Sequence, residues 1–264
     1  MAESTESQVS SPYIVPNLDR ALSIIEVLAE HPEGMTIKHI VQMMSLPKSS
    51  VFRILLTLAE RNYAMRDEKT GRYVLSARLL WLAHRAVGEH NVVEKALDQM
   101  RDLRDLHKET VCICTLLGDQ LVVLEQVLGL HPFKFTLDVG MHAPLPCNAP
   151  GKVLLAFIPD ERREALLKNM ELKRYTPNTV VSMEELRREL EEIRRAGYAE
   201  DRGEMIEGAH CISAPVLDRH RFPVAAIWAT GPSDRMPMSA FPKIAPSVME
   251  CAKEISRRLG GSWS

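Results

Sequence analysis

Hydrogen-bond donors and cations gather at the start of one predicted helix, in the stretch SLPKSSVFRILLTL. Lys48, Ser49, Ser50 and Arg53 fall within its first two turns, and Thr57 follows one turn later. Ammonium, guanidinium and hydroxyl groups donate hydrogen bonds to phosphate oxygens and to the edges of bases. In helix-turn-helix proteins, the residues at the start of the second helix make these contacts in the major groove. The spacing therefore predicts that this helix contacts duplex DNA.

Cysteine and histidine side chains in the rest of the chain suggest a second kind of chemistry, as thiol nucleophiles or metal ligands. The set comprises Cys112, Cys114, Cys147, Cys211, His107, His142 and His210. Cys112 and Cys114 share a predicted strand face, but this is not the C-x-x-C spacing of a zinc knuckle, and no H-E-x-x-H completes a site. G-x-S-x-G, P-loop and G-x-G-x-x-G motifs are also absent from the sequence. We interpret the thiols as buried strand residues and expect neither an enzyme nor a metal or other cofactor. A thiol- or metal-sensing regulator, and less readily a small-molecule enzyme, stay open as alternatives.

Two further helices are predicted before the DNA-contacting one. The first covers NLDRALSIIEVLAEHPEG, with Asn17 as its N-cap. Its apolar stripe comprises Leu18, Leu22, Ile25 and Leu28. The second is short and begins after Thr36, which caps it. Its inward face comprises Ile37, Ile40, Val41 and Met44.

A tight turn and a hairpin complete a winged helix-turn-helix, expected over residues 14–75. Pro47 lies where the first turn of the third helix accepts proline. Strands in YAMRD and GRYVLS flank the turn EKTG, where Gly71 permits a positive φ. Lys69 and Arg72 on this hairpin would reach the DNA backbone or the minor groove. The residues expected to contact DNA are Thr36, Lys48, Ser49, Ser50, Arg53, Thr57, Lys69 and Arg72.

Charge is distributed unevenly along the 264 residues, whose net charge is −2. Between Gly34 and Gly88, nine Lys or Arg face three acidic residues, an excess of six positive charges. A basic segment on an acidic body is typical of a protein with a polyanionic partner. The first thirteen residues are polar, without the apolar region of a secretory signal, and are expected to form a disordered tail. Five cysteines, too few for a disulfide scaffold, favour a reducing cytoplasm.

The remaining chain predicts a connecting helix and an α+β domain over residues 91–264. The connecting helix is expected from Ser76 to Gly88, within a linker of residues 76–90. Asn91 with Glu94 indicates the start of the next helix. Hairpins are predicted around TVCICTLL and LVVLEQV and around HCISAPVL and PVAAIWAT, with short strands in residues 133–145. The helices are expected from about Ala149, after a capping box of Ser182 and Glu185 up to Gly197, and from Pro242 to Leu259.

The sequence resembles the IclR family of bacterial transcription regulators over residues 17 to about 235. The stretches that carry the resemblance are RALSIIEVLAEHPEG, LPKSSVFRILLTLAERNY, GRYVLSARLLWLA, APLPCNAPGKVLLAF, YTPNTVVSMEELRRELEEIRRAGYAEDRGE and CISAPVLDRHRFPVAAIWATGP. The resemblance implies an N-terminal winged helix for operator DNA, a linker helix and a C-terminal GAF-like effector domain. It also implies homodimers, often paired into tetramers, and a small organic acid as effector. We expect a repressor controlled by a small carboxylate.

Three places in the chain match positions that hold the effector in this family. They contribute Asn148, Ala149 and Pro150; Asp201, Ala209 and Cys211; and Trp228 and Thr230. A helix start after Asn148 suits a carboxylate, although Asn148 can equally cap its own helix, and Pro150 has no N–H. Asp201 is either an acceptor for a ligand hydroxyl or a loop residue, and Cys211 either a contact or a small buried residue. Trp228 departs from the small polar residue of many relatives and either fills the core, narrows the cavity or stacks on a planar ligand.

Overall fold

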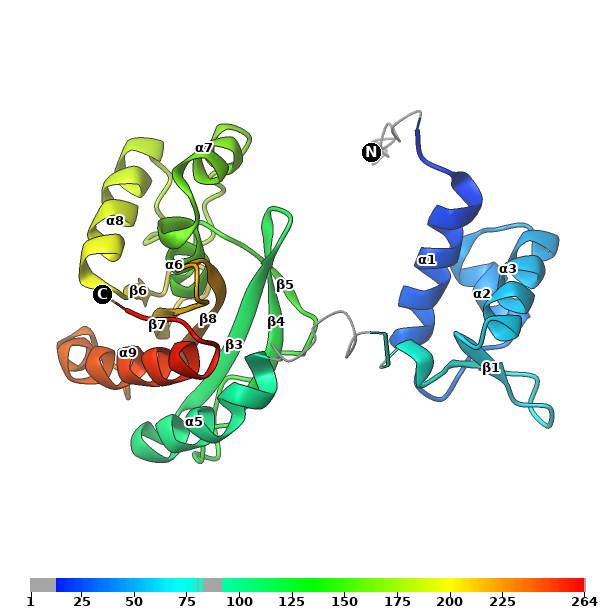
Figure 1. The fold of residues 1–264 in the computed structure, drawn as a ribbon, viewed down its shortest axis with the longest axis horizontal. Helices are drawn as coiled ribbons and strands as arrows, with labels where there is room; N and C mark the ends of the chain where they lie inside the picture. The colour runs from blue at the N-terminus through cyan, green and yellow to red at the C-terminus, as the bar shows by residue number, and fades with distance from the viewer. Residues whose placement is uncertain (1–12, 80, 83–91, 264) are drawn as a thin grey trace. The chain divides into compact units, whose positions relative to one another are not determined.

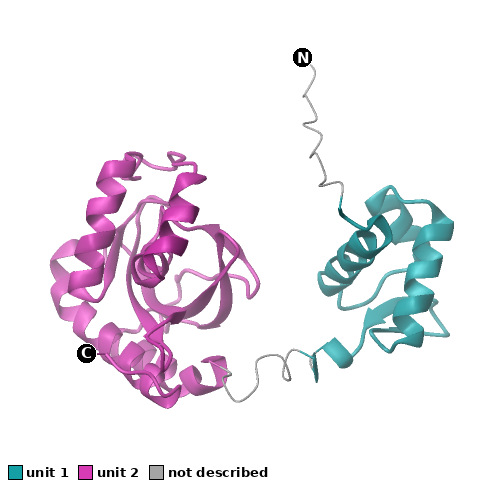
Figure 2. Ribbon diagram, turned by 45° about the horizontal axis from the view of Figure 1, so that its top comes forward, with its two compact units in different colours: residues 1–89 teal, residues 90–264 magenta. Residues whose placement is uncertain are grey.

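The computed structural model describes residues 13–79, 81–82 and 92–263 and divides into two compact units, residues 1–89 and 90–264 (Figure 2). The first unit has one hydrophobic core of its own and the second has two. Most of the predicted connecting helix, and the predicted helix start at Asn91, lie outside the described residues.

The first unit has the predicted order of three helices and a β-hairpin (Figure 1). Its elements are α1 (Pro16–Ala29), α2 (Ile37–Met44), α3 (Lys48–Glu60), β1 (Ala64–Arg66) and β2 (Tyr73–Leu75). Ile40 from α2 and Val51 and Leu55 from α3 are fully buried against Ile24 of α1. The hairpin is antiparallel, and Gly71 in its connection has φ +65°. The winged helix-turn-helix prediction is confirmed.

The turn between α2 and α3 follows from its local chemistry. Thr36 caps α2 and accepts a hydrogen bond from the His39 N–H at 3.4 Å. Ser45 ends α2 in a left-handed conformation with φ +54°, which reverses the chain. Pro47, at φ −59°, is the residue immediately before α3. The start of α3 is therefore fixed by two backbone positions only two residues apart.

Helix α1 differs from the prediction at its start and on its apolar face. It begins at Pro16, whose fixed φ suits the first turn, so Asn17 lies inside the helix and is not its cap. Leu18 and Leu22 were expected in the core, but their exposed fractions are 59% and 53%. The buried positions are Ile24 and Leu28, because the stripe that meets α3 is rotated from the one that the leucines mark.

The second unit is built on a six-stranded antiparallel sheet with strand order β5-β4-β3-β8-β7-β6. The strands are β3 (Thr110–Leu117), β4 (Gln120–Val127), β5 (His142–Pro144), β6 (Ala199–Arg202), β7 (Ala209–Leu217) and β8 (Pro223–Pro232). The helices are α5 (Val92–His107), α6 (Ala149–Phe157), α7 (Asp160–Lys168), α8 (Met183–Ala196), the short 3-10 helix η2 (Met238–Ala240) and α9 (Phe241–Arg258). The α+β fold prediction is confirmed.

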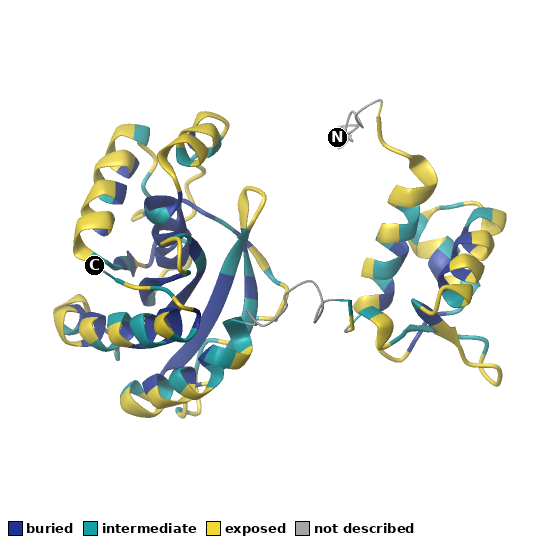
Figure 3. Ribbon diagram, in the orientation of Figure 1, coloured by how far each residue is buried: buried dark blue, intermediate teal, exposed yellow. Residues whose placement is uncertain are grey.

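Alternation along the strands divides the second unit into two cores on opposite faces of the sheet. The strands are mostly buried, and the helices expose their outer sides (Figure 3). Val111 and Ile113 of β3 face α5 and α9, whereas Cys112 and Cys114 face α6 and α8. Of the helices on the second face, α6 borders the cavity described below through its start. No helix among the described residues is long and apolar enough to cross a membrane.

Two stretches of the second unit differ from the predicted elements. Strands were predicted within residues 133–145, but only residues 142–144 form one. The rest of the segment is an irregular loop whose backbone is held by hydrogen bonds from the side chains of Thr110 and Gln126. Strand β6 was not predicted, since AEDR has no apolar alternation of its own.

Candidate nucleic-acid interface and ligand cavity

The start of α3 presents cations and hydroxyls on its outer face. Lys48, Ser49, Arg53 and Thr57 are exposed, and Ser50 is half-buried. The inner face of the helix comprises the buried Val51, Ile54, Leu55 and Leu58. The packing of α3 therefore orients the polar residues away from the core of the first unit.

Phe52 is a further exposed residue at the start of α3 that the sequence analysis did not single out. Its exposed fraction is 48%, and it directly precedes Arg53. An exposed aromatic side chain beside a cation is suited to contact a thymine methyl group. The signal in the sequence was an aromatic residue outside the i, i+3, i+4, i+7 pattern of the buried face.

The hairpin holds its two basic residues in different environments. Lys69 is exposed in the connection, where Asp67 Oδ1 accepts hydrogen bonds from the N–H of Lys69 at 2.8 Å and of Thr70 at 3.2 Å. These hydrogen bonds lower the pKa of Asp67, and the one from the Lys69 N–H has the largest effect. Arg72 is half-buried and donates from Nη1 to the carbonyl oxygen of Gly34 at 2.9 Å. Arg72 therefore attaches the hairpin to the segment before α2, and Lys69 is the more accessible of the two cations.

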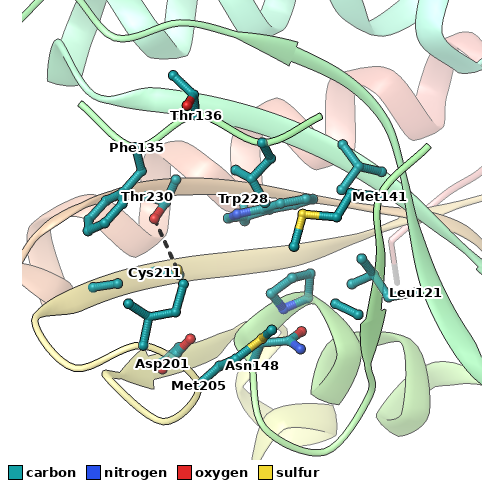
Figure 4. A pocket seen from close by; sticks show the side chains of 16 residues that line it. Leu121, Phe135, Thr136, Met141, Asn148, Asp201, Met205, Cys211, Trp228 and Thr230 are labelled. Carbon is teal, nitrogen blue, oxygen red and sulfur yellow. Dashed lines mark hydrogen bonds between the residues drawn. The ribbon is translucent and has the colours of Figure 1, made fainter. Parts of the chain in front are cut away.

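A cavity of about 140 Å³ lies between the sheet and the start of α6 in the second unit (Figure 4). Its lining comprises Leu121, Val123, Phe135, Thr136, Leu137, Met141, Ala143, Asn148, Pro150, Asp201, Met205, Ile206, Ala209, Cys211, Trp228 and Thr230. Most of this surface is apolar. A cavity of about 150 Å³ holds a benzene molecule, so this one has room for a ligand of about one ring.

Seven of the eight residues that were expected to hold a ligand line this cavity. They are Asn148, Pro150, Asp201, Ala209, Cys211, Trp228 and Thr230. Ala149 is fully buried in the core and is not part of the lining. Trp228 and Thr230 point to the same side of β8 because Ala229 between them faces the other core. These residues come from separate parts of the chain, and the sheet brings them together.

The start of α6 is already provided with hydrogen bonds from within the protein. Asn148 Oδ1 accepts from the Gly151 N–H at 2.8 Å, and Asn148 Nδ2 donates to the Pro144 carbonyl at 2.6 Å. A Cβ at Gly151 would overlap the backbone of Leu145, so only glycine allows α6 this close to that segment. Because Pro150 has no N–H, the helix start offers few donors to a ligand carboxylate. Asn148 is thus a helix cap that also borders the cavity.

Asp201 is the ionisable carboxyl in the cavity lining, and its exposed fraction is 3%. Its Oδ1 accepts a hydrogen bond from the Glu204 N–H at 2.8 Å. Burial raises the pKa of Asp201, and this effect is only partly offset by the backbone hydrogen bond and by the charge of Lys152. On the neighbouring strands, Cys211 Sγ donates to Thr230 Oγ1 at 3.3 Å, which leaves the Thr230 O–H proton to donate elsewhere.

A buried ion cluster lies directly behind Asp201. Lys152 on α6 is fully buried, and its Nζ donates to Glu189 Oε1 at 2.8 Å and to Glu204 Oε1 at 2.6 Å. Glu204 Oε2 is also 2.6 Å from Nζ. The buried Oε2 atom of Glu189 accepts no hydrogen bond from any described residue, and Glu204 Oε2 has no partner among them besides the Lys152 ammonium group. Burial raises the pKa of Glu204 to about 7 against the opposing effect of Lys152.

The cysteine side chains are all buried, and burial raises their thiol pKa values. The pKa rises to about 11 for Cys147 and to about 12 for Cys251, so these thiols stay protonated at neutral pH. Thiolate is the reactive form of cysteine, and burial suppresses it here. Within the described ranges, no group of three or more His, Cys, Asp or Glu side chains is arranged to hold a metal ion. The geometry therefore gives no support to thiol or metal sensing.

Part of the cavity lining comes from the loop after β4 and was not predicted from the sequence. This part comprises Phe135, Thr136, Leu137 and Met141. Gln126 Oε1 accepts from the Leu137 N–H at 3.1 Å, and Thr110 Oγ1 donates to the Phe135 carbonyl at 2.8 Å. The alternation of Phe135 and Leu137 with polar neighbours was the available signal, but it predicted a strand and not a cavity wall.

Comparisons with known proteins give matches along nearly the whole chain. The family model for the IclR helix-turn-helix domain matches residues 17–68, and that for the bacterial transcriptional regulator IclR C-terminal region matches residues 84–257. The chain is 30% identical to the HTH-type transcriptional regulator KdgR of Escherichia coli over 94% of each chain. It is 27% identical to the transcriptional repressor IclR of the same species, over 94% of this chain and 91% of the relative.

Solved structures agree with these matches. IclR of Thermotoga maritima is 29% identical and covers 93% of this chain and 99% of its own, with a TM-score of 0.74. An IclR homolog of Microbacterium hydrocarbonoxydans complexed with 4-hydroxybenzoate is 25% identical, covers 92% of this chain and 99% of its own, and has a TM-score of 0.78.

Proposed function

The chain belongs to the IclR family of bacterial transcriptional regulators, and on this basis we propose that it is a repressor controlled by a small organic acid. Like its relatives, it is a DNA-binding transcriptional regulator and not an enzyme. The effector would occupy the cavity beside α6, and the protein would act in the cytoplasm, where the DNA is. The corresponding parts would be a tail (residues 1–13), a DNA-binding domain (14–75), a linker helix (76–90) and an effector domain (91–264).

The observation that carries the DNA-binding assignment is the orientation of α3. Its exposed face comprises Lys48, Ser49, Arg53 and Thr57, with Ser50 half-buried at its edge. Lys48 and Arg53 provide charge for phosphates, and Arg53 can also form two hydrogen bonds to a guanine. Lys69 on the hairpin would add a backbone contact. Thr36 and Arg72, which already form hydrogen bonds within the protein, would contact the DNA with the donors that these bonds leave free.

An organic acid as effector is supported by the size and lining of the cavity. The relative bound to 4-hydroxybenzoate carries a one-ring acid, and a cavity of about 140 Å³ fits a ligand of this size. Trp228 and Phe135 offer aromatic surface, while Thr136 and Thr230 offer hydroxyl donors.

Self-association through α1 is part of the proposal. Val15, Leu18 and Leu22 have exposed fractions of 61%, 59% and 53%. Apolar residues spaced along one exposed helix indicate a contact surface, and a dimer would present two α3 helices to two half-sites of an operator. A pair of such dimers would form the tetramer that the resemblance implies.

Selection of bound duplexes from a random pool, followed by an effector titration, tests this function. The full chain should enrich one sequence with two related half-sites. Adding 4-hydroxybenzoate or a similar one-ring acid should then change the affinity for that duplex and raise the melting temperature of the protein. Absence of any enriched duplex would contradict the regulator, and an unchanged affinity with every acid would contradict the effector assignment.

A further inference from the structure

We infer that the cavity binds an organic acid together with one proton, which the carboxyl groups of Asp201 and Glu204 take up. A neutral Asp201 would then donate its O–H to the carboxylate of the ligand. This inference rests on the proposed function, because it concerns the effector cavity of a regulator. It adds the charge state in which the effector is bound.

The cavity provides no positive charge to a ligand. Its lining among the described residues comprises apolar side chains, neutral donors such as Thr136, Thr230 and Asn148, and the carboxyl group of Asp201. The start of α6, which would attract an anion, is occupied by Asn148 and interrupted by Pro150. A carboxylate entering this cavity would lie beside Asp201 with no cation in the described lining to balance either group.

The groups behind Asp201 increase this imbalance. Lys152 on α6 is the buried cation of the cluster, and it is shared between Glu204 after β6 and Glu189 on α8. With Asp201, three carboxyl groups therefore face one ammonium group. Glu189 Oε2 has no donor among the described residues, and both oxygens of Glu204 share the single Lys152 ammonium group. The donors around these carboxyls are therefore too few for three ionised carboxylates.

Arg202 and His210 lie near the pair but outside the cavity lining, and the charge of His210 offsets the effect of burial on the pKa of Asp201 only in part. Arg202 on β6 donates from Nη2 to Glu200 Oε2 at 2.6 Å and is engaged there. On β7, the Nδ1 of His210 lies 2.8 Å from the Met236 carbonyl, and because a carbonyl only accepts, Nδ1 carries a proton. The nearby thiols of Cys147 and Cys211 remain neutral because burial raises their pKa values.

Protonation of one carboxyl removes the conflict and creates a donor. The pKa of Glu204 is already raised to about 7, and that of Asp201 is raised by burial. An arriving anion raises both further, because a nearby negative charge disfavours a second one. A carboxylic acid kept neutral in an apolar site is a strong donor to an oxyanion. Binding therefore takes up a proton at and above neutral pH.

Calorimetric titration of the full chain with benzoate and with neutral benzamide tests the inference. At pH 7.5, in two buffers with different ionisation enthalpies, benzoate should bind with uptake of about one proton and benzamide with none. By linkage, the Kd for benzoate should rise by up to about tenfold per pH unit between pH 7 and 8.5. Benzoate binding without proton uptake, and with a Kd that does not change with pH, would overturn this inference. The proposed control by an organic acid would still stand.

Isosteric variants assign the proton to the proposed pair. Asp201→Asn together with Glu204→Gln should abolish proton uptake, and the variant should bind benzoate at least tenfold more tightly than wild type at pH 8.5. Glu161→Gln removes an exposed carboxyl on α7 and should leave uptake unchanged. Persistent uptake in the double variant would overturn the inference. If benzoate binds neither wild type at pH 6.5 nor the double variant, the organic-acid effector itself is rejected.

Discussion

Asn148 both caps α6 and borders the cavity. It was predicted with both interpretations open, and the structure shows that its Oδ1 caps α6. Asn148→Ala removes this cap and should lower the free energy of unfolding by about 1 kcal/mol, measured by urea denaturation. Asn148→Ser keeps a capping oxygen and should retain most of the stability. Equal losses in both variants would mean that the cap is not what Asn148 contributes.

Glu204 should make stability depend on pH in an unusual direction. Its pKa in the folded protein is raised from 4.5 to about 7, so the folded state holds a proton that the unfolded state has released between these values. The free energy of unfolding should therefore fall as the pH rises from about 5 to about 7.

Glu204→Gln should flatten this fall, measured by urea denaturation at several pH values. The exposed Glu161→Gln should not. The prediction would be contradicted if the free energy of unfolding of the wild type rose over this range and Glu204→Gln showed the same pH dependence. Glu204 would then not hold a proton in the folded protein near neutral pH.

Residue identities predicted the lining of the cavity better than they predicted each residue's role. Asp201 and Thr230 could be placed from the resemblance and from strand alternation. The partners of Lys152 could not, because Glu189 and Glu204 lie far away in sequence and meet Lys152 only after β6 and α8 have packed. The partner of Arg72 could not be predicted either, because its hydrogen bond to Gly34 depends on the fold of the whole first unit.

Among the elements, α1 has more apolar surface than the core of its unit uses. Leu18 and Leu22 are exposed, although the pattern placed them in the core. If this surface is the contact between two copies, Leu18→Gln with Leu22→Gln should shift the protein toward monomer in sedimentation velocity and leave the melting temperature nearly unchanged. Leu117→Gln, at an exposed apolar residue of β3, provides the control.

An unchanged assembly state in the α1 variant would contradict this contact. Loss of the fold would instead mean that the two leucines are needed within the unit itself, and a melting curve separates the two results.

Elements with strong local signals were the predictable ones. The three helices and hairpin of the first unit, and strands β3, β4, β7 and β8, follow from apolar periodicity and from turn residues. Strand β6 and the loop after β4 have no such pattern, because pairing with β7 and hydrogen bonds from Gln126 determine their conformations. The loop carries part of the cavity wall, which explains why that wall was missed.

At the scale of the whole molecule, the basic segment and the buried carboxyl cluster lie in different compact units. This division agrees with DNA binding by one unit and effector binding by the other. The excess of six positive charges between Gly34 and Gly88 lies in the unit that carries α3 and is local to that segment, because residues 1–89 together have ten Lys or Arg and ten Asp or Glu. The carboxyl-rich cluster belongs to the other unit. Binding to DNA should therefore weaken steeply with salt, whereas binding of an effector should respond to pH.

The most direct test of the account is the affinity of Arg53→Ala for the selected duplex, measured by fluorescence anisotropy from 50 to 200 mM salt. Arg101→Ala, which removes an exposed cation from α5 in the other unit, is the matched control. We predict that Arg53→Ala binds roughly tenfold to a hundredfold more weakly with an unchanged melting temperature, while Arg101→Ala binds like wild type. Wild-type affinity of Arg53→Ala at every salt concentration would contradict the claim that the exposed start of α3 binds DNA.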